Sequence, residues 1–138
     1  MIVRCKSVAL DREQLALVGK PFSATQAALL ELDKEYVVYG LQFETQSLIW
    51  GTGVWLQVAA EERIAFAPVC LFDVVEGHVS RHWDLRTWED GSVTLWPPSF
   101  YADYYHDDLT AKKKDVVEDF RQVREVLERE ARGDKSLT

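Results

Sequence analysis

Residues 35–43, EYVVYGLQF, are the stretch that decides the fold class. Tyr, Val, Leu and Phe suit a pleated, half-buried strand, and they follow one another here almost without interruption. Gly40 interrupts the run, which indicates a β-bulge or a close approach of another group to the backbone. We therefore predict a strand over 35–43 and arrange the other elements around it.

The flanking segments also predict strands. Residues 2–10, IVRCKSVAL, begin with polar and apolar positions in alternation, which is typical of a first strand. Residues 47–50 and 54–59 are apolar and are separated by Gly-Thr-Gly at 51–53. That spacing fits either two strands joined by a tight turn or one strand interrupted by a bulge. Residues 11–33 remain open between a short helix and an irregular arm, with a turn signal at 19–21 (Gly-Lys-Pro).

The second half of the chain predicts further strands and a hairpin. Pro68 lies within the apolar run 63–75, so we expect it at a sheet edge or a strand break. Asp-Gly at 90–91 separates the strand-like runs 82–88 and 92–96, a strong hairpin signal. The double proline at 97–98 then ends the sheet.

The last element is an amphipathic helix. Its apolar positions recur at helical spacing: Val116, Phe120, Val123 and Leu127. We expect Thr110 or Asp108 to cap its start and Gly133 to end it. Several short strands followed by one helix predict an α+β fold, with an antiparallel, strongly curved sheet or small, partly open β-barrel and one C-terminal amphipathic helix.

The chain of 138 residues predicts a single domain, 1–138. We divide it into four parts: a β-rich body 1–98, an aromatic and acidic arm 99–109, a C-terminal helix at about 110–131 and a short disordered tail 132–138. Cys5 and Cys70 lie in apolar runs, form no CxxC pair and predict buried, reduced thiols. With neither a signal-peptide pattern nor a membrane-length apolar run, we expect a cytoplasmic protein with no membrane contact.

The formal net charge is −7, and the excess acid is concentrated in the middle of the chain. Residues 31–108 hold 14 Asp and Glu against four Lys and Arg, whereas residues 111–138 are nearly neutral. An acidic surface repels phosphate backbones and attracts basic proteins, so we expect no nucleic-acid partner. The same charge also fits solubility alone, without any partner.

Catalytic motifs are missing from the sequence: there is no GxSxG, P-loop, GxGxxG or HExxH pattern. We therefore expect no enzyme activity and no cofactor. One alternative stays open, a metal-binding or hydrolytic domain that uses His106, Asp107 and Asp108, with His82 as a further ligand. Carboxylates just before a helix are more often a solvated cap.

Aromatic residues gather where acidic residues do. Seven of the 16 aromatic side chains fall within residues 83–105, mixed with Asp and Glu. Exposed Tyr among Asp is typical of an interface with a basic protein, although a packed arm would explain the same composition. The candidate partner-binding residues are Asp84, Glu89, Asp90, Tyr101, Asp103, Tyr104, Tyr105, Asp107 and Asp108.

Three strings carry a resemblance: DKEYVVYGLQF at 33–43, PVCLFDVVEGHVSRHWDL at 68–85 and PPSFYADYYHDD at 97–108. Together with the terminal helix, they resemble small acidic bacterial proteins of the immunity type, which neutralise toxin domains. The resemblance implies a protein-binding module that occludes a basic toxin domain, and it carries over no catalytic or binding residue. A homo-oligomeric assembly module, such as a homodimer, is the remaining alternative.

Overall fold

The computed structural model describes residues 1–18, 29–60 and 63–133. Its seven-stranded sheet consists of β1 (Ile2–Cys5), β2 (Glu35–Ser47), β3 (Gly51–Ala60), β4 (Arg63–Pro68), β5 (Phe72–Glu76), β6 (Asp84–Thr87) and β7 (Val93–Trp96). The helical elements are α1 (Arg12–Leu17), α3 (Tyr105–Thr110) and α4 (Lys114–Ala131), with 3₁₀ turns η1 (Val69–Leu71) and η2 (Pro98–Tyr101).

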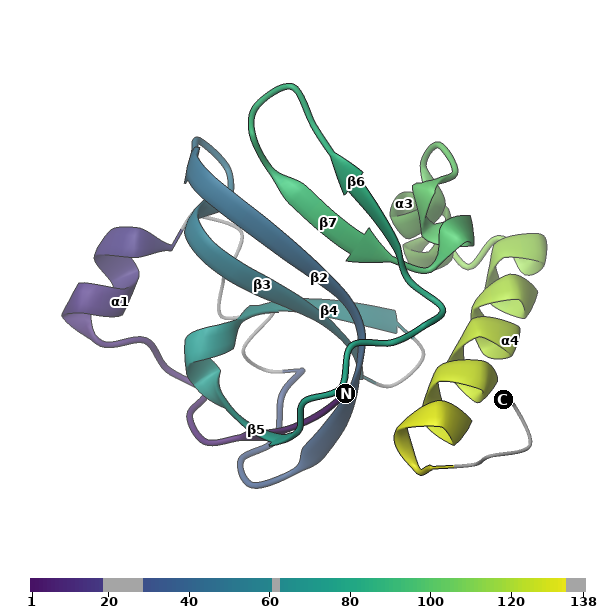
Figure 1. Cartoon of the computed structure of the whole chain (residues 1–138), viewed down its shortest axis with the longest axis horizontal. Helices are drawn as coiled ribbons and strands as arrows, with labels where there is room; N and C mark the ends of the chain where they lie inside the picture. Colours follow the sequence, from purple (N-terminus) through teal and green to yellow (C-terminus); the bar gives the residue numbers. More distant parts are fainter. Residues whose placement is uncertain (19–28, 61–62, 134–138) are drawn as a thin grey trace.

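Strand β2 is the central strand of the sheet. One edge pairs with β3, and the other edge pairs first with β1, at Val37, and then with β7, at Phe43. All pairings are antiparallel, and the path β4-β3-β2-β1-β5 does not close on itself. The predicted α+β fold is thus confirmed, with the strongly curved sheet of that prediction; α4 stands beside it (Figure 1).

The sheet has an apolar core on each face. One core contains side chains of β1 to β5 together with Leu30 and Trp83. The other lies between the sheet and the helices, where Tyr39 of β2 meets Phe100, Tyr105 and Phe120. The arm that follows β7 is therefore held by burial of its own aromatic side chains.

Helix α4 presents the predicted apolar stripe to the second core. Phe120 and Leu127 are buried, while Val116 and Val123 pack against them. The predicted start near 110 is wrong, because α3 ends at Thr110 and Lys112 then adopts a left-handed backbone with φ 59°. The expected caps are wrong as well: the N-cap is Lys113. The end is as predicted, with Gly133 at φ 75° after Ala131.

The predictions for the N-terminal third need two changes. Strand β1 ends at Cys5, not at residue 10, because Lys6 and Ser7 both donate their N–H groups to the carbonyl of Leu71. Helix α1 follows, started by a capping box between Asp11 and Gln14. The turn expected at 19–21 and most of the tail expected at 132–138 lie outside the described residues.

The strand connections and the two cysteines can also be compared with the sequence predictions. The 89–91 hairpin joins β6 and β7, and Pro68 ends the edge strand β4, both as predicted. The turn between β2 and β3 lies at 48–50, so Gly51 already belongs to β3. Cys5 is buried and Cys70 is half-buried, and desolvation raises the pKa of both thiols. In the described part of the chain, no helix has the length and apolar character needed to span a bilayer.

Gly40 is the position where the sheet has no room for a side chain. A Cβ atom there would lie 2.9 Å from Cδ1 of Trp96 and 3.3 Å from the carbonyl oxygen of Leu95. The register of β2 with β3 also shifts between Val38 and Gly40. The glycine thus combines the bulge and the close approach that the sequence left as alternatives.

We predict that Gly40→Ala destabilises the fold by about 1–3 kcal/mol, because the Trp96 ring cannot move without losing its own packing. Urea unfolding followed by Trp fluorescence measures the change. Gly77→Ala is the control, since its Cβ would meet only Val74 at an ordinary 3.4 Å. Equal stability of the two variants would contradict the prediction.

Candidate functional site

The Trp96 ring is the centre of an aromatic cluster at the end of β7. Tyr101 stacks on it with ring centroids 4.8 Å apart and planes at 30°. The ring of His106 meets it edge-on at 5.4 Å, and Trp88 lies at 6.4 Å. The guanidinium carbon of Arg86 is 3.9 Å from the Tyr101 ring centroid, a cation–π contact. The hairpin β6–β7 and the arm therefore share one stacked set of rings.

The Tyr101 hydroxyl fastens the arm to the hairpin. It lies 2.8 Å from Thr94 Oγ1 and donates to the carbonyl oxygen of Asp84 at 2.8 Å. The indole N–H of Trp88 donates to the same Thr94 hydroxyl at 3.1 Å. Tyr101 was predicted as a partner-binding residue, and its stacked and bonded ring chiefly holds the surface in place.

Tyr105 belongs to the core. Its side chain is 4% exposed, and its ring centroid lies 4.9 Å from that of Phe100. The hydroxyl donates to Asp119 Oδ2 at 2.7 Å, which ties α3 to α4. Burial, and then this carboxylate, raise the pKa of Tyr105. The expectation that Tyr105 is exposed for a partner is therefore wrong.

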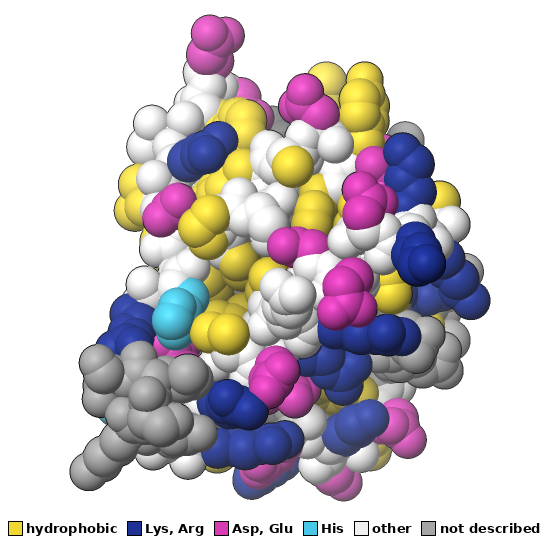
Figure 2. Space-filling model, turned by 90° about the vertical axis from the view of Figure 1, so that its right-hand side faces the viewer, with side chains coloured by type: hydrophobic (Ala, Val, Ile, Leu, Met, Phe, Trp, Pro, Cys, Tyr) yellow, Lys and Arg dark blue, Asp and Glu magenta, His cyan; other side chains and the backbone are white. Residues whose placement is uncertain are grey.

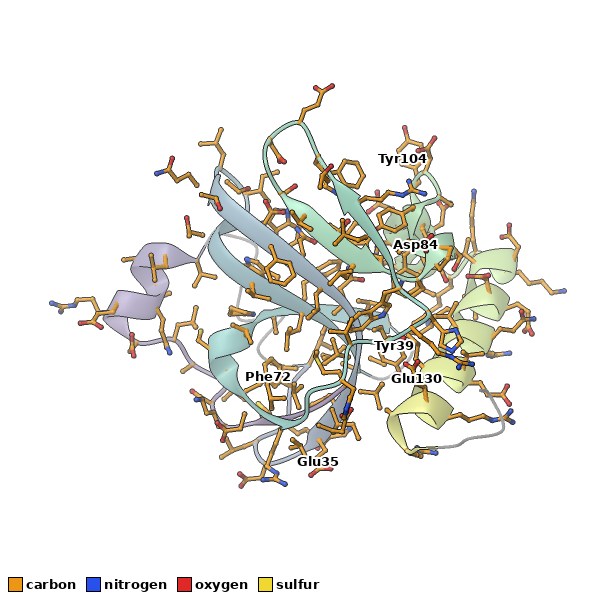
Figure 3. All side chains as sticks on the ribbon, viewed as in Figure 1. Glu35, Tyr39, Phe72, Asp84, Tyr104 and Glu130 are labelled. Carbon is orange, nitrogen blue, oxygen red and sulfur yellow. The ribbon has the colours of Figure 1, made fainter. Side chains whose placement is uncertain are left out.

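Tyr104 has the opposite environment. Its side chain is 75% exposed, and its backbone is left-handed with φ 63°. That conformation is uncommon for a bulky residue and carries a cost in backbone strain. Tyr104 stands at the N-cap of α3, on the outer side of the arm (Figure 3). An exposed aromatic ring on a strained backbone contributes little to the fold and is free to contact a partner.

A depression of about 280 Å³ lies beside Tyr104. Five of the predicted residues line it: Tyr101, Asp103, Tyr104, Tyr105 and Asp107. Asp103 and Asp107 are exposed residues, so their carboxylates lie at the rim of the depression. The structure thus brings the predicted aromatic and acidic residues of the arm, except Asp108, to one place.

The remaining predicted acids have different surroundings. Asp84 is exposed on β6, and Glu89 and Asp90 are exposed at the hairpin tip. The hydroxyl and N–H of Ser92 donate to Asp90 and lower the pKa of its carboxyl group. Asp108 is half-buried, with Lys113 Nζ 3.7 Å away, so its charge is already partnered.

Glu44 is a residue that the sequence did not single out. It is 8% exposed on β2 and accepts a hydrogen bond from Gln42 Nε2 at 2.8 Å. Burial, and to a smaller extent the charge of Asp90, raise the pKa of its carboxyl group. Nothing in the sequence indicates that Glu44 is buried. Alternation of faces along β2 cannot be followed past the bulge at 38–40, because a bulge changes which side chains share a face.

His106 is half-buried, and its imidazole packs among other side chains. Its Nε2 is 2.8 Å from Oε1 of the fully buried Gln57. Four aromatic rings surround the imidazole at centroid distances of 5.3–5.8 Å: Phe66, Trp96, Phe100 and Tyr105. Burial lowers the pKa of His106 to about 4, although the charge of Asp107 acts in the opposite direction.

The residues of the alternative metal or hydrolytic centre, His106, Asp107 and Asp108, each have different surroundings. The imidazole Nε2 is 2.8 Å from Oε1 of Gln57, Asp107 is exposed, and Asp108 is next to Lys113. His82 is elsewhere, with its Nε2 3.8 Å from Glu130. Within residues 1–18, 29–60 and 63–133, no group of three or more His, Cys, Asp or Glu is placed to hold a metal ion.

Comparisons of the chain with family models, with curated proteins and with solved structures gave no match.

We predict that His106 makes the fold sensitive to acid. Its pKa is about 4 in the folded chain against 6.5 for a free imidazole, so the unfolded chain binds the proton first. This stabilisation is complete above about pH 6.5 and is lost as the pH falls towards 4, by roughly 3 kcal/mol in total. Urea unfolding between pH 7 and pH 4 measures it.

The matched variants are His106→Asn and His78→Asn. His106→Asn lowers stability at pH 7 but removes this part of the pH dependence. His78→Asn removes an exposed imidazole that contacts Glu76, so the part of the pH dependence that His106 contributes remains. A pH dependence that is the same in wild type and His106→Asn would show that the prediction is wrong.

We predict that Tyr104→Gly stabilises the fold by up to about 1 kcal/mol, because glycine adopts a positive φ without the steric cost. Ala102→Gly is the control: Ala102 has an ordinary φ of −63°, so glycine there lowers stability. Thermal and urea unfolding give both values. A loss of stability in Tyr104→Gly as large as that in Ala102→Gly would mean that the Tyr104 ring supports the fold.

Proposed function

We propose that the chain is a protein-binding module of the immunity type, which neutralises a basic toxin domain by occluding it. One observation carries the proposal: Tyr104 is 75% exposed on a strained backbone, next to the exposed carboxylates of Asp103 and Asp107. Aromatic side chains dominate the energetics of protein interfaces, and surrounding charges select the partner.

The charge of the chain supports a basic partner. The formal net charge is −7, and Asp84, Glu89 and Asp90 on the hairpin add to the acids of the arm. Complementary charge of this kind accelerates the encounter with a cationic protein and disfavours nucleic acid. The aromatic side chains favour a protein partner, and the negative charge favours one that is basic.

The fastening of the arm supports a tight complex. Tyr101 is bonded to Thr94 and to the backbone of Asp84, and Tyr105 is bonded to Asp119. A surface that is already ordered loses little conformational entropy on binding, so more of the contact energy remains as affinity. The buried aromatic residues of the arm would therefore act by positioning Tyr104 and the two aspartates.

A cytoplasmic location belongs to the same proposal. Cys5 and Cys70 are both free thiols. Unpaired cysteines are typical of reducing compartments.

The test is co-expression with the product of the neighbouring gene. We expect that product to be toxic alone, to be harmless with this chain and to be recovered with it in a pull-down. Asp103→Lys combined with Asp107→Lys should slow association at low salt at least about tenfold and weaken its salt dependence, since the steering charge is reversed. Stopped-flow fluorescence measures both quantities.

The matched control is Glu13→Lys combined with Asp73→Lys, which makes the same change in net charge at exposed positions on α1 and β5. Its association rate should change only through net charge, and therefore far less. A product that neither harms the cell nor binds would overturn the proposal, and equal effects of the two double variants would place the interface elsewhere.

A further inference from the structure

A second and larger depression runs along α4. It has a volume of about 440 Å³ and lies between α4 and the segment that leads into β6. Its apolar lining comes from Val123, Val126 and Leu127 on one side and from Pro97 and Pro98 on the other. Figure 2 faces this side of the molecule and shows apolar side chains at the bottom of a central hollow.

Two carboxylates line the groove from different elements. Asp84 comes from β6 and is exposed, and Asp119 comes from α4. The Tyr105 hydroxyl donates a hydrogen bond to Oδ2 of Asp119. No ion pair of either aspartate is present among the described residues. The groove therefore combines an apolar lining with two carboxylates that form no ion pair within the described part of the chain.

At the end of the groove near Arg81, the carboxylate of Glu130 already has partners from this chain. The backbone N–H of Arg81 donates to Glu130 Oε2 at 3.1 Å, and His82 Nε2 lies 3.8 Å from the same carboxylate. Asp84 and Glu130 lie along the boundary between the sheet and α4 (Figure 3). Because Arg81 supplies a positive charge and Glu130 already has partners, a ligand cation is favoured at the Asp84 and Asp119 end.

The groove also adjoins the candidate site. Turn η2 separates the two depressions, with Pro98 and Ser99 on the groove side and Phe100 and Tyr101 on the side of Tyr104. A partner that covers Tyr104 would need only to extend across one 3₁₀ turn to reach the groove. The two depressions can therefore belong to one interface.

We infer that the groove along α4 binds a short segment of the basic partner in which a lysine or arginine follows an apolar residue. The apolar side chain and the methylene stem of the basic residue pack on Val123, Val126 and Pro98, and the cation lies between Asp84 and Asp119. This inference rests on the proposed function and specifies how the partner is recognised.

The experiment uses the full chain with ¹³C-labelled methyl groups and the peptide acetyl-Leu-Arg-amide as the probe. We expect shifts in the methyl signals of Val123, Val126 and Leu127, and weaker or no shifts with acetyl-Leu-citrulline-amide, which has the same shape without the charge. Asp84→Asn and Asp119→Asn should each weaken binding about tenfold. Asn at 119 keeps an acceptor for the Tyr105 hydroxyl, so the variant tests charge and not folding.

Asp115→Asn is the control, since Asp115 is an exposed carboxylate of α4 outside the groove. The inference is overturned if the three methyl signals do not shift at about 10 mM peptide, where a millimolar Kd is visible. It is overturned too if citrulline binds equally or if Asp115→Asn weakens binding as much. If the peptide does not bind in the groove but the neighbouring gene product still binds through Asp103 and Asp107, the groove inference is wrong and the proposed function stands.

Discussion

The ring of Trp96 lies directly on the backbone of Gly40, where a Cβ atom would be only 2.9 Å away. Because β2 leaves this space, the ring stays close to the sheet and offers its outer face to Tyr101 at 4.8 Å. His106 meets the same ring edge-on and is bonded to Gln57 of β3. The contact of Trp96 with Gly40 thus sets where Tyr101 and His106 of the arm meet the sheet.

The sheet was predictable from the sequence because its signals are local. Strand-favouring residues predict β2, Asp-Gly predicts the β6–β7 hairpin, and Gly40 predicts the irregularity in β2. The extents of the strands were not local: β2 continues beyond the predicted residue 43 to Ser47, because its pairing with β3 and not its composition decides its length. The break at Lys112 between α3 and α4 was missed because Lys rarely marks a left-handed position.

The candidate site was only partly predictable, since composition does not say which aromatic ring is buried. Tyr101, Tyr104 and Tyr105 are near neighbours among the same aspartates, yet one is stacked, one is exposed and one is in the core. The difference arises from tertiary contacts: Asp119 and Phe100 reach Tyr105 from outside the tripeptide 103–105. No local pattern contains that information, because it depends on how α4 returns to the sheet.

The two depressions can be understood as consequences of how the arm is held. Turn η2 buries Phe100 and directs Tyr101 onto the hairpin, so the chain must turn sharply before α3 begins. The left-handed backbone at Tyr104 makes that turn, and Tyr105 then bonds to Asp119. That bond keeps the Asp119 carboxylate beside the groove along α4. The same fastening therefore exposes an aromatic ring on one side of η2 and holds a carboxylate on the other, which are the two features on which the proposed interface with a basic protein rests.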